Sequence, residues 1–259
     1  MNDLDLILQA AKEAGELALA AREEGLKIWS KDGGSPVTDA DLAVDTLLKT
    51  ELTAERPDYG WLSEETADDP ARLTTRRQFV VDPIDGTAAF MKNKPWFAVS
   101  IAVVENGQPI AGVVHAPALD ETYAATIDGP ATLNGKPIKS SATAELFGAA
   151  MLGDAKMFAH PAWREPWPEM RIESRNSIAY RMCLVAAGTF DAAIALSPKS
   201  EWDLAAADLI CRRAGAAVSD HKGRDFAYNR SVPLVPSLVC ANRALAPLIL
   251  SRVGHIELP

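Results

Sequence analysis

The segment Asp82-Pro83-Ile84-Asp85-Gly86-Thr87 brings two carboxylates, a bend and a hydroxyl together directly after an apolar run. That run, Phe79-Val80-Val81, is typical of a buried strand, so the polar groups arrive where a strand ends and a helix could begin. Two carboxylates on one sharp turn can face the same point, and their repulsion makes this costly unless a cation lies between them. The pair therefore predicts a cation site.

The residues at the end of the same segment could bind an anion. Gly86 lets the backbone approach a ligand closely, and the amides of Gly86 and Thr87 would be unpaired donors at a helix N-terminus. Carboxylates, amides and a hydroxyl together indicate metal-assisted hydrolysis of a phosphate ester. Phosphatases that form an aspartyl-phosphate have one residue between their two aspartates, whereas Pro83 and Ile84 both intervene here. A plain surface turn with exposed aspartates is the simpler alternative.

Further polar residues could join this turn from other parts of the chain. Glu64 ends a short predicted strand, and because adjacent strand residues point in opposite directions, only one of Glu64 and Glu65 should face the site. Asp41 and Asp203 each lie at the start of a predicted helix, where an acid can also be a cap, and Thr87 could cap its own helix. Their joint presence around a turn that needs a cation favours the functional interpretation.

Composition limits the class of protein. The 259 residues are 48% hydrophobic and 24% charged, which is ordinary for a globular protein. The net charge of −9 disfavours binding to a nucleic acid polymer, and an acidic protein that acts on an anionic substrate must concentrate positive charge locally, as bound metal ions do. The absence of a signal-peptide pattern and of a membrane-length apolar run predicts a cytoplasmic protein with no membrane partner. Cys183, Cys211 and Cys240 are expected to be reduced core thiols.

Hydrophobic spacing predicts the elements that must position these residues. The predicted helices are 3–24, 38–55, 177–187, 203–214 and 242–250. The predicted strands are 61–63, 79–81, 98–104, 109–115, 122–126, 190–195 and 217–219. Asn106-Gly107 predicts a hairpin turn. The polar stretch 67–77 is expected to be a mobile surface loop, and the Pro- and Trp-rich stretch 161–168 an irregular segment that borders a pocket. Helix–strand alternation after a meander predicts an α/β (α+β) fold of stacked layers.

Four motifs, in this order, resemble those of the inositol monophosphatase family, the magnesium-dependent, lithium-sensitive phosphomonoesterases related to fructose-1,6-bisphosphatase. They are Val37-Thr38-Asp39-Ala40-Asp41, Ser63-Glu64-Glu65-Thr66, Asp82-Pro83-Ile84-Asp85-Gly86-Thr87 and Glu201-Trp202-Asp203-Leu204-Ala205-Ala206. The resemblance covers nearly the whole chain. It implies a layered α/β/α/β/α sandwich formed by a single domain over residues 1–259, with an N-terminal half of about 1–145 and a C-terminal half of about 146–259. It also implies a homodimer.

The resemblance further implies metal ligands, with two or three Mg²⁺ ions per site. Glu64, Asp82 and the backbone carbonyl of Ile84 would hold the ion that carries the attacking water. Asp82, Asp85 and Asp203 would hold a second ion, which stabilises the leaving alkoxide, and a third, looser ion would attach through Glu64.

The same resemblance implies roles in catalysis and in substrate binding. The implied catalytic residues are Glu64, Thr87 and Asp41, with Thr87 hydrogen-bonded to Asp41 to help take the proton from the water. The amides of Gly86 and Thr87 would hold the phosphate. The implied substrate-binding residues are Asp85, Gly86, Thr87, Arg181 and Asp203.

The substrate is the least determined feature, because the family divides among inositol, 3′,5′-bisphosphorylated adenosine, histidinol and sugar bisphosphates. Leu196 lies at about the position where inositol-selective members commonly have an acid. Arg181 and Lys199 are candidate cations for the second phosphate of a nucleotide, and the stretch 105–118 also resembles bacterial nucleotidases, although Ala88-Ala89-Phe90 does not. The expected order is bisphosphate nucleotidase, inositol-1-monophosphatase, then histidinol phosphatase. A regulatory binding protein of the same fold that has lost catalysis is the alternative from another class.

Overall fold

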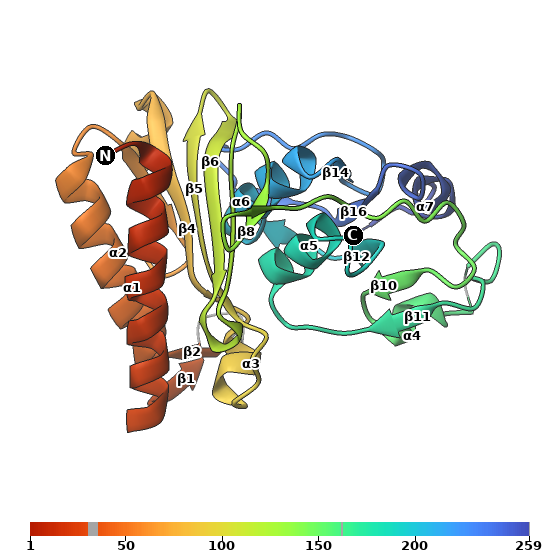
Figure 1. Ribbon diagram of the computed structural model, residues 1–259, viewed down its shortest axis with the longest axis horizontal. Coiled ribbons are helices and arrows are strands. Elements are labelled where there is room, and N and C mark those ends of the chain that lie inside the picture. Colours follow the sequence, from red (N-terminus) through yellow and green to blue (C-terminus); the bar gives the residue numbers. More distant parts are fainter. Residues whose placement is uncertain (31–35, 162, 259) are drawn as a thin grey trace.

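The computed structural model describes residues 1–30, 36–161 and 163–258. Its elements form five layers in the order helices, sheet, helices, sheet, helix (Figure 1). Each layer packs against the next through apolar side chains, and the core forms three clusters between layers. The predicted α/β/α/β/α sandwich is confirmed.

The first layer consists of α1 (Asp3–Glu24) and α2 (Asp39–Glu55), which both cover one face of the first sheet (Figure 1). Both helices form where the hydrophobic spacing predicts them. A Cβ atom on Gly15 of α1 would lie 2.7 Å from the ring of His115, so the absence of a side chain lets α1 approach the sheet closely. The lower end of α1 faces a two-stranded ribbon, β1 (Ile28–Ser30) and β2 (Pro36–Thr38).

The first sheet has seven strands in the order β3-β4-β5-β6-β7-β8-β9, with β3 parallel to β4 and every other neighbouring pair antiparallel. The strands are β3 (Gly60–Ser63), β4 (Arg77–Asp85), β5 (Ala98–Glu105), β6 (Gln108–Ala116), β7 (Glu121–Thr126), β8 (Thr132–Leu133) and β9 (Lys136–Pro137). Asn106 and Gly107 adopt φ angles of 51° and 78°, which confirms the predicted hairpin turn between β5 and β6.

Side chains of β4 alternate between the two faces of this sheet. Phe79 and Val81 lie in the core against α1 and α2, whereas Val80 lies in the core on the opposite side. By the same alternation Asp82 faces the side of Val80, towards the inner helices. The strand thus aims this acid into the middle of the molecule.

The inner helical layer consists of α5 (Ile178–Ala186) and α6 (Glu201–Arg213), which lie between the two sheets (Figure 1). The second sheet has the order β11-β10-β12-β16-β14, and α7 (Ala246–Val253) packs on its outer face. Its strands are β10 (Ala150–Leu152), β11 (Arg171–Glu173), β12 (Ala192–Ala195), β14 (Ala216–Ser219) and β16 (Leu238–Asn242). Smaller elements are α3 (Thr87–Met91), α4 (Ala155–Phe158), the pair β13 (Lys199–Ser200) and β15 (Leu234–Val235), and the 3₁₀ helices Pro70–Thr74 and Pro117–Leu119.

Two stretches differ from the sequence-based expectation. Residues 67–77 lie mostly at the surface, as predicted, but they contain the 3₁₀ helix Pro70–Thr74 and the buried Arg72, whose Nε lies 2.5 Å from Asp68 Oδ1. The predicted helix 242–250 begins later, at Ala246, because Asn242 ends β16. The Asn242 side chain accepts hydrogen bonds from the amides of Ala244 and Leu245, which turns the chain into the helix.

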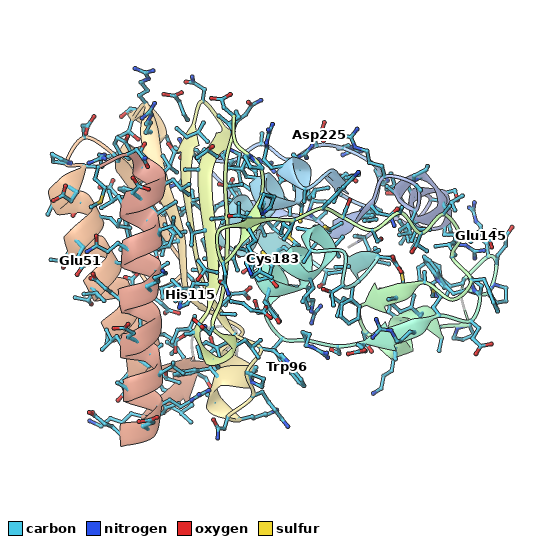
Figure 2. All side chains as sticks on the ribbon, in the orientation of Figure 1. Glu51, Trp96, His115, Glu145, Cys183 and Asp225 are labelled. Atoms are coloured by element: carbon cyan, nitrogen blue, oxygen red, sulfur yellow. The ribbon has the colours of Figure 1, made fainter. Side chains whose placement is uncertain are left out.

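Cys183, Cys211 and Cys240 are buried free thiols, as predicted, and Figure 2 shows Cys183 in the layer between the sheets. In the described part of the chain, no helix combines the length and apolar character that a membrane crossing requires.

Candidate metal centre and active site

The end of β4 places two of the predicted acids next to each other. The pairing of β4 with β5 shifts its register between Asp82 and Asp85, which is the irregularity that a β-bulge produces. Gly86 follows in the left-handed conformation, with φ of 95°, and α3 begins at the next residue. A Cβ atom on Gly86 would lie 2.9 Å from Ser177 N and 3.0 Å from Trp96 O, so the turn requires glycine for both conformation and space.

A third acid reaches the same point from the inner helical layer. One ligand atom from each of Asp82, Asp85 and Asp203 lies within 4.8 Å of the other two. Asp203 is also part of a capping box at the start of α6, where its Oδ2 accepts a hydrogen bond of 2.9 Å from Ser200 N. Asp203 therefore both caps α6 and belongs to the acidic cluster, because its carboxylate has two oxygens.

Asp82 provides the strongest indication that a cation belongs here. Both of its carboxylate oxygens are buried, and neither has a hydrogen-bond partner among the described residues. Burying a carboxylate without donors is costly, and so is placing three carboxylates together. A hard divalent cation removes both costs, and carboxylate oxygens are the ligands that Mg²⁺ prefers. The residues present therefore fit the magnesium site that the sequence predicts.

The pKa values of the clustered acids report the same crowding. Burial, followed by the charges of Glu64 and Asp85, raises the pKa of Asp82 well above its usual range. Burial and the charge of Asp85 raise the pKa of Asp203 to about 8. Burial raises the pKa of Asp85 to about 6, although hydrogen bonds to its carboxylate oppose the shift. Without a cation, this site favours bound protons.

The start of α5 holds Asp85 in place. Ser177 Oγ and Ala179 N each donate a hydrogen bond of 2.6 Å to Asp85 Oδ2. One oxygen of Asp85 thus satisfies the helix N-terminus, while the carboxylate still belongs to the cluster. Sequence reasoning did not identify Ser177 and Ala179 as site residues; a serine at the start of a predicted helix was the available signal.

Glu64 lies next to the cluster at the end of β3. Its backbone N–H donates to Val81 O at 3.3 Å, which places Glu64 beside Asp82 across the parallel pair β3 and β4. The charge of Glu64 contributes to the raised pKa values of Asp82, Asp85 and Asp203. Glu64 is close enough to interact with the three clustered acids, although it is outside the group within 4.8 Å.

The predicted pair of Thr87 and Asp41 is in contact. Thr87 Oγ1 lies 3.2 Å from Asp41 Oδ1 and 3.2 Å from the carbonyl oxygen of Ile84, so its one hydroxyl proton has two alternative acceptors. The other carboxylate oxygen of Asp41 accepts hydrogen bonds from Thr38 N at 2.8 Å and Thr38 Oγ1 at 2.6 Å. This capping box at the start of α2 fixes the orientation of Asp41.

Two cationic side chains lie near the acids. Burial lowers the pKa of Arg181, and the charge of Asp85 opposes that shift. Burial likewise lowers the pKa of Lys199, and Asp203 opposes it. Arg181 donates to the carbonyl of Arg175, and Lys199 Nζ donates to Pro198 O at 2.8 Å. Both cations therefore hydrogen-bond to nearby backbone carbonyls, and their charges interact with those of Asp85 and Asp203. Leu196 packs with the outer core.

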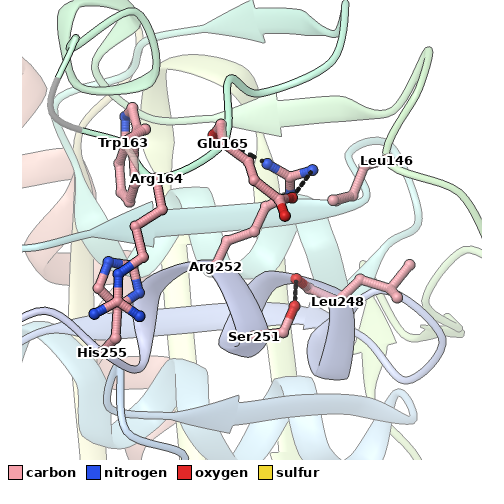
Figure 3. Close-up of a pocket in the computed structure, with 8 residues that line it drawn as sticks. All are labelled: Leu146, Trp163, Arg164, Glu165, Leu248, Ser251, Arg252 and His255. Carbon is pink, nitrogen blue, oxygen red and sulfur yellow. Dashed lines mark hydrogen bonds and ion pairs between the residues drawn. The ribbon is translucent and has the colours of Figure 1, made fainter.

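A separate pocket lies on the outer side of the second sheet. It has a volume of about 410 Å³, and Trp163, Arg164 and Glu165 of the segment 161–168 form part of its wall, so the prediction that this segment borders a pocket is confirmed. Figure 3 shows Glu165 paired with Arg252 of α7, at 3.6 Å between Oε2 and Nη2. The described residues of its lining include none of the predicted site residues. We therefore assign the chemistry to the acids.

The sequence matches known proteins over almost its full length. The pattern of the inositol monophosphatase family matches residues 3–257. A histidinol-phosphatase from Chlorobaculum parvum is 32% identical and covers 98% of both chains. A 3′(2′),5′-bisphosphate nucleotidase from Escherichia coli strain K12 is 31% identical over 87% of this chain and 93% of its own.

The fold matches in the same way. The solved structure of a Thermotoga maritima IMPase is 27% identical and superimposes with a TM-score of 0.85 over 98% of this chain and 97% of its own. Together with the acidic cluster, these similarities establish the class of the protein. The chain belongs to the inositol monophosphatase family and is a metal-dependent phosphoric monoester hydrolase.

Proposed function

We propose that this protein is a magnesium-dependent phosphatase that hydrolyses a small phosphorylated metabolite by attack of water. The buried carboxylate of Asp82, which has no hydrogen-bond donor in the described structure, is the observation on which the proposal rests. Glu64, Asp82 and the carbonyl of Ile84 would hold one ion, and Asp82, Asp85 and Asp203 a second, with a third attached loosely through Glu64. When bound, the ions would activate water and stabilise the leaving oxygen.

The remaining residues of the site would orient the substrate and move a proton. The hydroxyl of Thr87 would accept the proton of the attacking water while it passes its own proton to Asp41 Oδ1, an arrangement that the contact of 3.2 Å supports. The left-handed turn at Gly86 would direct the amides of Gly86 and Thr87 to the phosphoryl oxygens. Thr38 would keep Asp41 in register for this exchange.

We propose a 3′(2′),5′-bisphosphate nucleotide as the first candidate substrate. Such a substrate carries a second phosphate beside the one that is cleaved, and Arg181 and Lys199 supply positive charge next to Asp85 and Asp203. Histidinol phosphate is the second candidate, because the histidinol-phosphatase relative spans 98% of both chains. Inositol 1-phosphate is the third candidate, because the apolar side chain of Leu196 offers no hydrogen-bonding group to a ring hydroxyl.

Phosphate release from a panel of substrates tests the function. The panel consists of adenosine 3′,5′-bisphosphate, histidinol phosphate, inositol 1-phosphate and fructose 1,6-bisphosphate, each with Mg²⁺ and with EDTA. We expect turnover that requires Mg²⁺, with the bisphosphate nucleotide preferred. Turnover of none of the four would instead support a regulatory binding protein.

A Lys199→Gln variant separates the first two candidates. Loss of a charge-assisted contact to the second phosphate costs about 1.4 kcal/mol or more, so kcat/KM for adenosine 3′,5′-bisphosphate should fall about tenfold or more. Histidinol phosphate lacks a second phosphate, so its kcat/KM should change less than about twofold. Lys92→Gln, which removes an exposed lysine, is the matched control. Equal losses for both substrates would exclude a phosphate-specific role of Lys199.

A further inference from the structure

Asp45 contacts the turn that carries Glu64. It lies on α2, one helical turn after Asp41, and it is buried. One carboxylate oxygen of Asp45 accepts a hydrogen bond from Ser63 Oγ, and the other accepts one of 2.5 Å from Thr66 Oγ1. The two hydroxyls immediately flank Glu64 and its neighbour, so one carboxylate holds both sides of the turn.

Hydrogen bonds also hold the backbone of the same turn. Ser63 Oγ accepts a hydrogen bond of 3.4 Å from Glu65 N, which closes a tight local turn around Glu64. Glu64 N donates to Val81 O, the residue before Asp82. The Glu64 backbone therefore lies between the strand that carries Asp82 and the helix that carries Asp45.

We propose that Asp45 is a positioning residue that fixes Glu64 in the geometry required to bind the metal. The proposal rests on the proposed function, because it takes Glu64 as a metal ligand. Hydrogen bonds to an ionised carboxylate are stronger than neutral ones, and residues that orient a metal ligand typically affect metal affinity about 10–100-fold. Residues four apart lie on the same face of a helix, so α2 supports the site twice, through Asp41 at Thr87 and through Asp45 at Glu64.

A purely structural role for Asp45 makes a different prediction. If the carboxylate only ties α2 to the end of β3, its loss should lower stability equally with and without metal. If Asp45 acts through Glu64, removing the Asp45 carboxylate should weaken the stabilisation by Mg²⁺. The same substitution should have no further effect on Mg²⁺ binding in a protein that already lacks the Glu64 carboxylate. The two roles can therefore be separated by a double-mutant cycle.

The test compares wild type, Asp45→Asn, Glu64→Gln and the double variant. For each, the unfolding temperature is followed as a function of added Mg²⁺, which reports binding independently of turnover. We expect Asp45→Asn to shift the half-maximal Mg²⁺ concentration upwards about tenfold, and the same shift to appear in the Mg²⁺ dependence of phosphate release. Glu55→Gln is the matched control, because it removes an exposed carboxylate from the same helix.

The outcomes distinguish the two levels of the proposal. If Glu64→Gln leaves Mg²⁺ binding unchanged, Glu64 is not a ligand and the proposed metal site is wrong. If Glu64→Gln weakens binding but Asp45→Asn does not, or if their effects add in the double variant, the positioning role is wrong and the metal site stands. Should Asp45→Asn fail to fold, Thr66→Val removes one of the two hydrogen bonds to Asp45, together with the long bond of 3.4 Å from Trp61 Nε1, and serves the same comparison.

Discussion

At the residue scale, the decisive feature is a set of carboxylates whose charged forms are disfavoured by burial and by mutual repulsion. Asp82 has no donor to its buried oxygens among the described residues, and Asp85 and Asp203 add like charge next to it. The pKa of Asp203 is raised to about 8 and that of Asp85 to about 6. The site is therefore arranged for binding a cation at the expense of the stability of the metal-free protein.

This arrangement predicts how the metal-free protein responds to pH. The folded-state pKa of Asp203 is raised above its unfolded value, so its stabilising contribution is complete below about pH 4 and is lost as the pH rises through about 8. Asp203→Asn removes the charge but keeps an oxygen that can accept from Ser200 N. In EDTA at pH 8, the variant should be more stable than wild type by a few kcal/mol, on the order of 1.4 kcal/mol per unit of pKa shift.

Urea unfolding at pH 5 and pH 8 measures this effect. The difference between variant and wild type should be smaller at pH 5 than at pH 8, because pH 5 lies only about one unit above the unfolded-state pKa. Added Mg²⁺ should stabilise wild type at pH 8 far more than the variant. Asp58→Asn, at an exposed position, should change neither. A metal-free Asp203→Asn protein that is less stable than wild type at pH 8 would contradict this account of the cluster.

At the scale of elements, the site depends on a few turns where strands and helices meet. Gly86 adopts a left-handed conformation against the backbone of Ser177 and Trp96. The Asp-Gly-Thr motif is a local signal, so the sequence could predict this turn. The helix starts at Asp41 and Asp203 could be predicted for the same reason. Sequence patterns could not predict that Ser177 binds Asp85, because the two lie 92 positions apart and only the tertiary fold brings them together.

Gly86→Ala tests the requirement for space at this turn. The left-handed conformation alone costs about 1–2 kcal/mol for a residue with a side chain. Gly135→Ala is a matched control, because Gly135 also has a positive φ, of 76°, but its Cβ would meet nothing within 4 Å. We expect Gly86→Ala to lose more stability in urea unfolding than Gly135→Ala, and to lose most activity because the start of α5 is displaced. Equal effects of the two variants would show that the close contacts are tolerated.

At the scale of the whole molecule, two halves of the chain are joined by buried charges that no local pattern reveals. Arg72 follows β3, yet its guanidinium donates to Asn229 Oδ1 at 2.6 Å and to Arg230 O at 2.9 Å. The amides of Asn229 and Arg230 in turn donate to Glu201, which opens α6 two residues before Asp203. The polar composition of 67–77 predicts exposure, which holds for most of the stretch but not for Arg72. Asp68 is a local partner of Arg72, whereas Asn229 and Arg230 are brought to it only by the tertiary fold. Strands β10 and β11 were not predicted, because three residues are too few to show an alternating pattern.

Arg72→Met should therefore destabilise the protein strongly. Breaking a buried charge network costs about 3–5 kcal/mol, and in this variant Asp68 loses its ion pair while Asn229 Oδ1 and the carbonyl of Arg230 lose their donor. Arg76→Met, which removes an arginine whose side chain is 79% exposed, should cost less than about 1 kcal/mol in the same urea titration. Similar values for the two variants would mean that the network contributes little to the free energy of unfolding.

The homodimer and the single-domain organisation stay predictions, which light scattering and limited proteolysis can check.

The alternation of side chains along β4 also restricts how the gene can change over evolutionary time. Adding or deleting one codon between Arg77 and Asp82 would turn Asp82 from the inner helices towards the apolar layer beneath α1 and α2. Such a variant would lose the proposed metal ligand Asp82 and would also bury its charge in an apolar layer. Changes of length should instead accumulate at exposed positions between elements such as Gly25, where an added side chain would meet nothing within 4 Å.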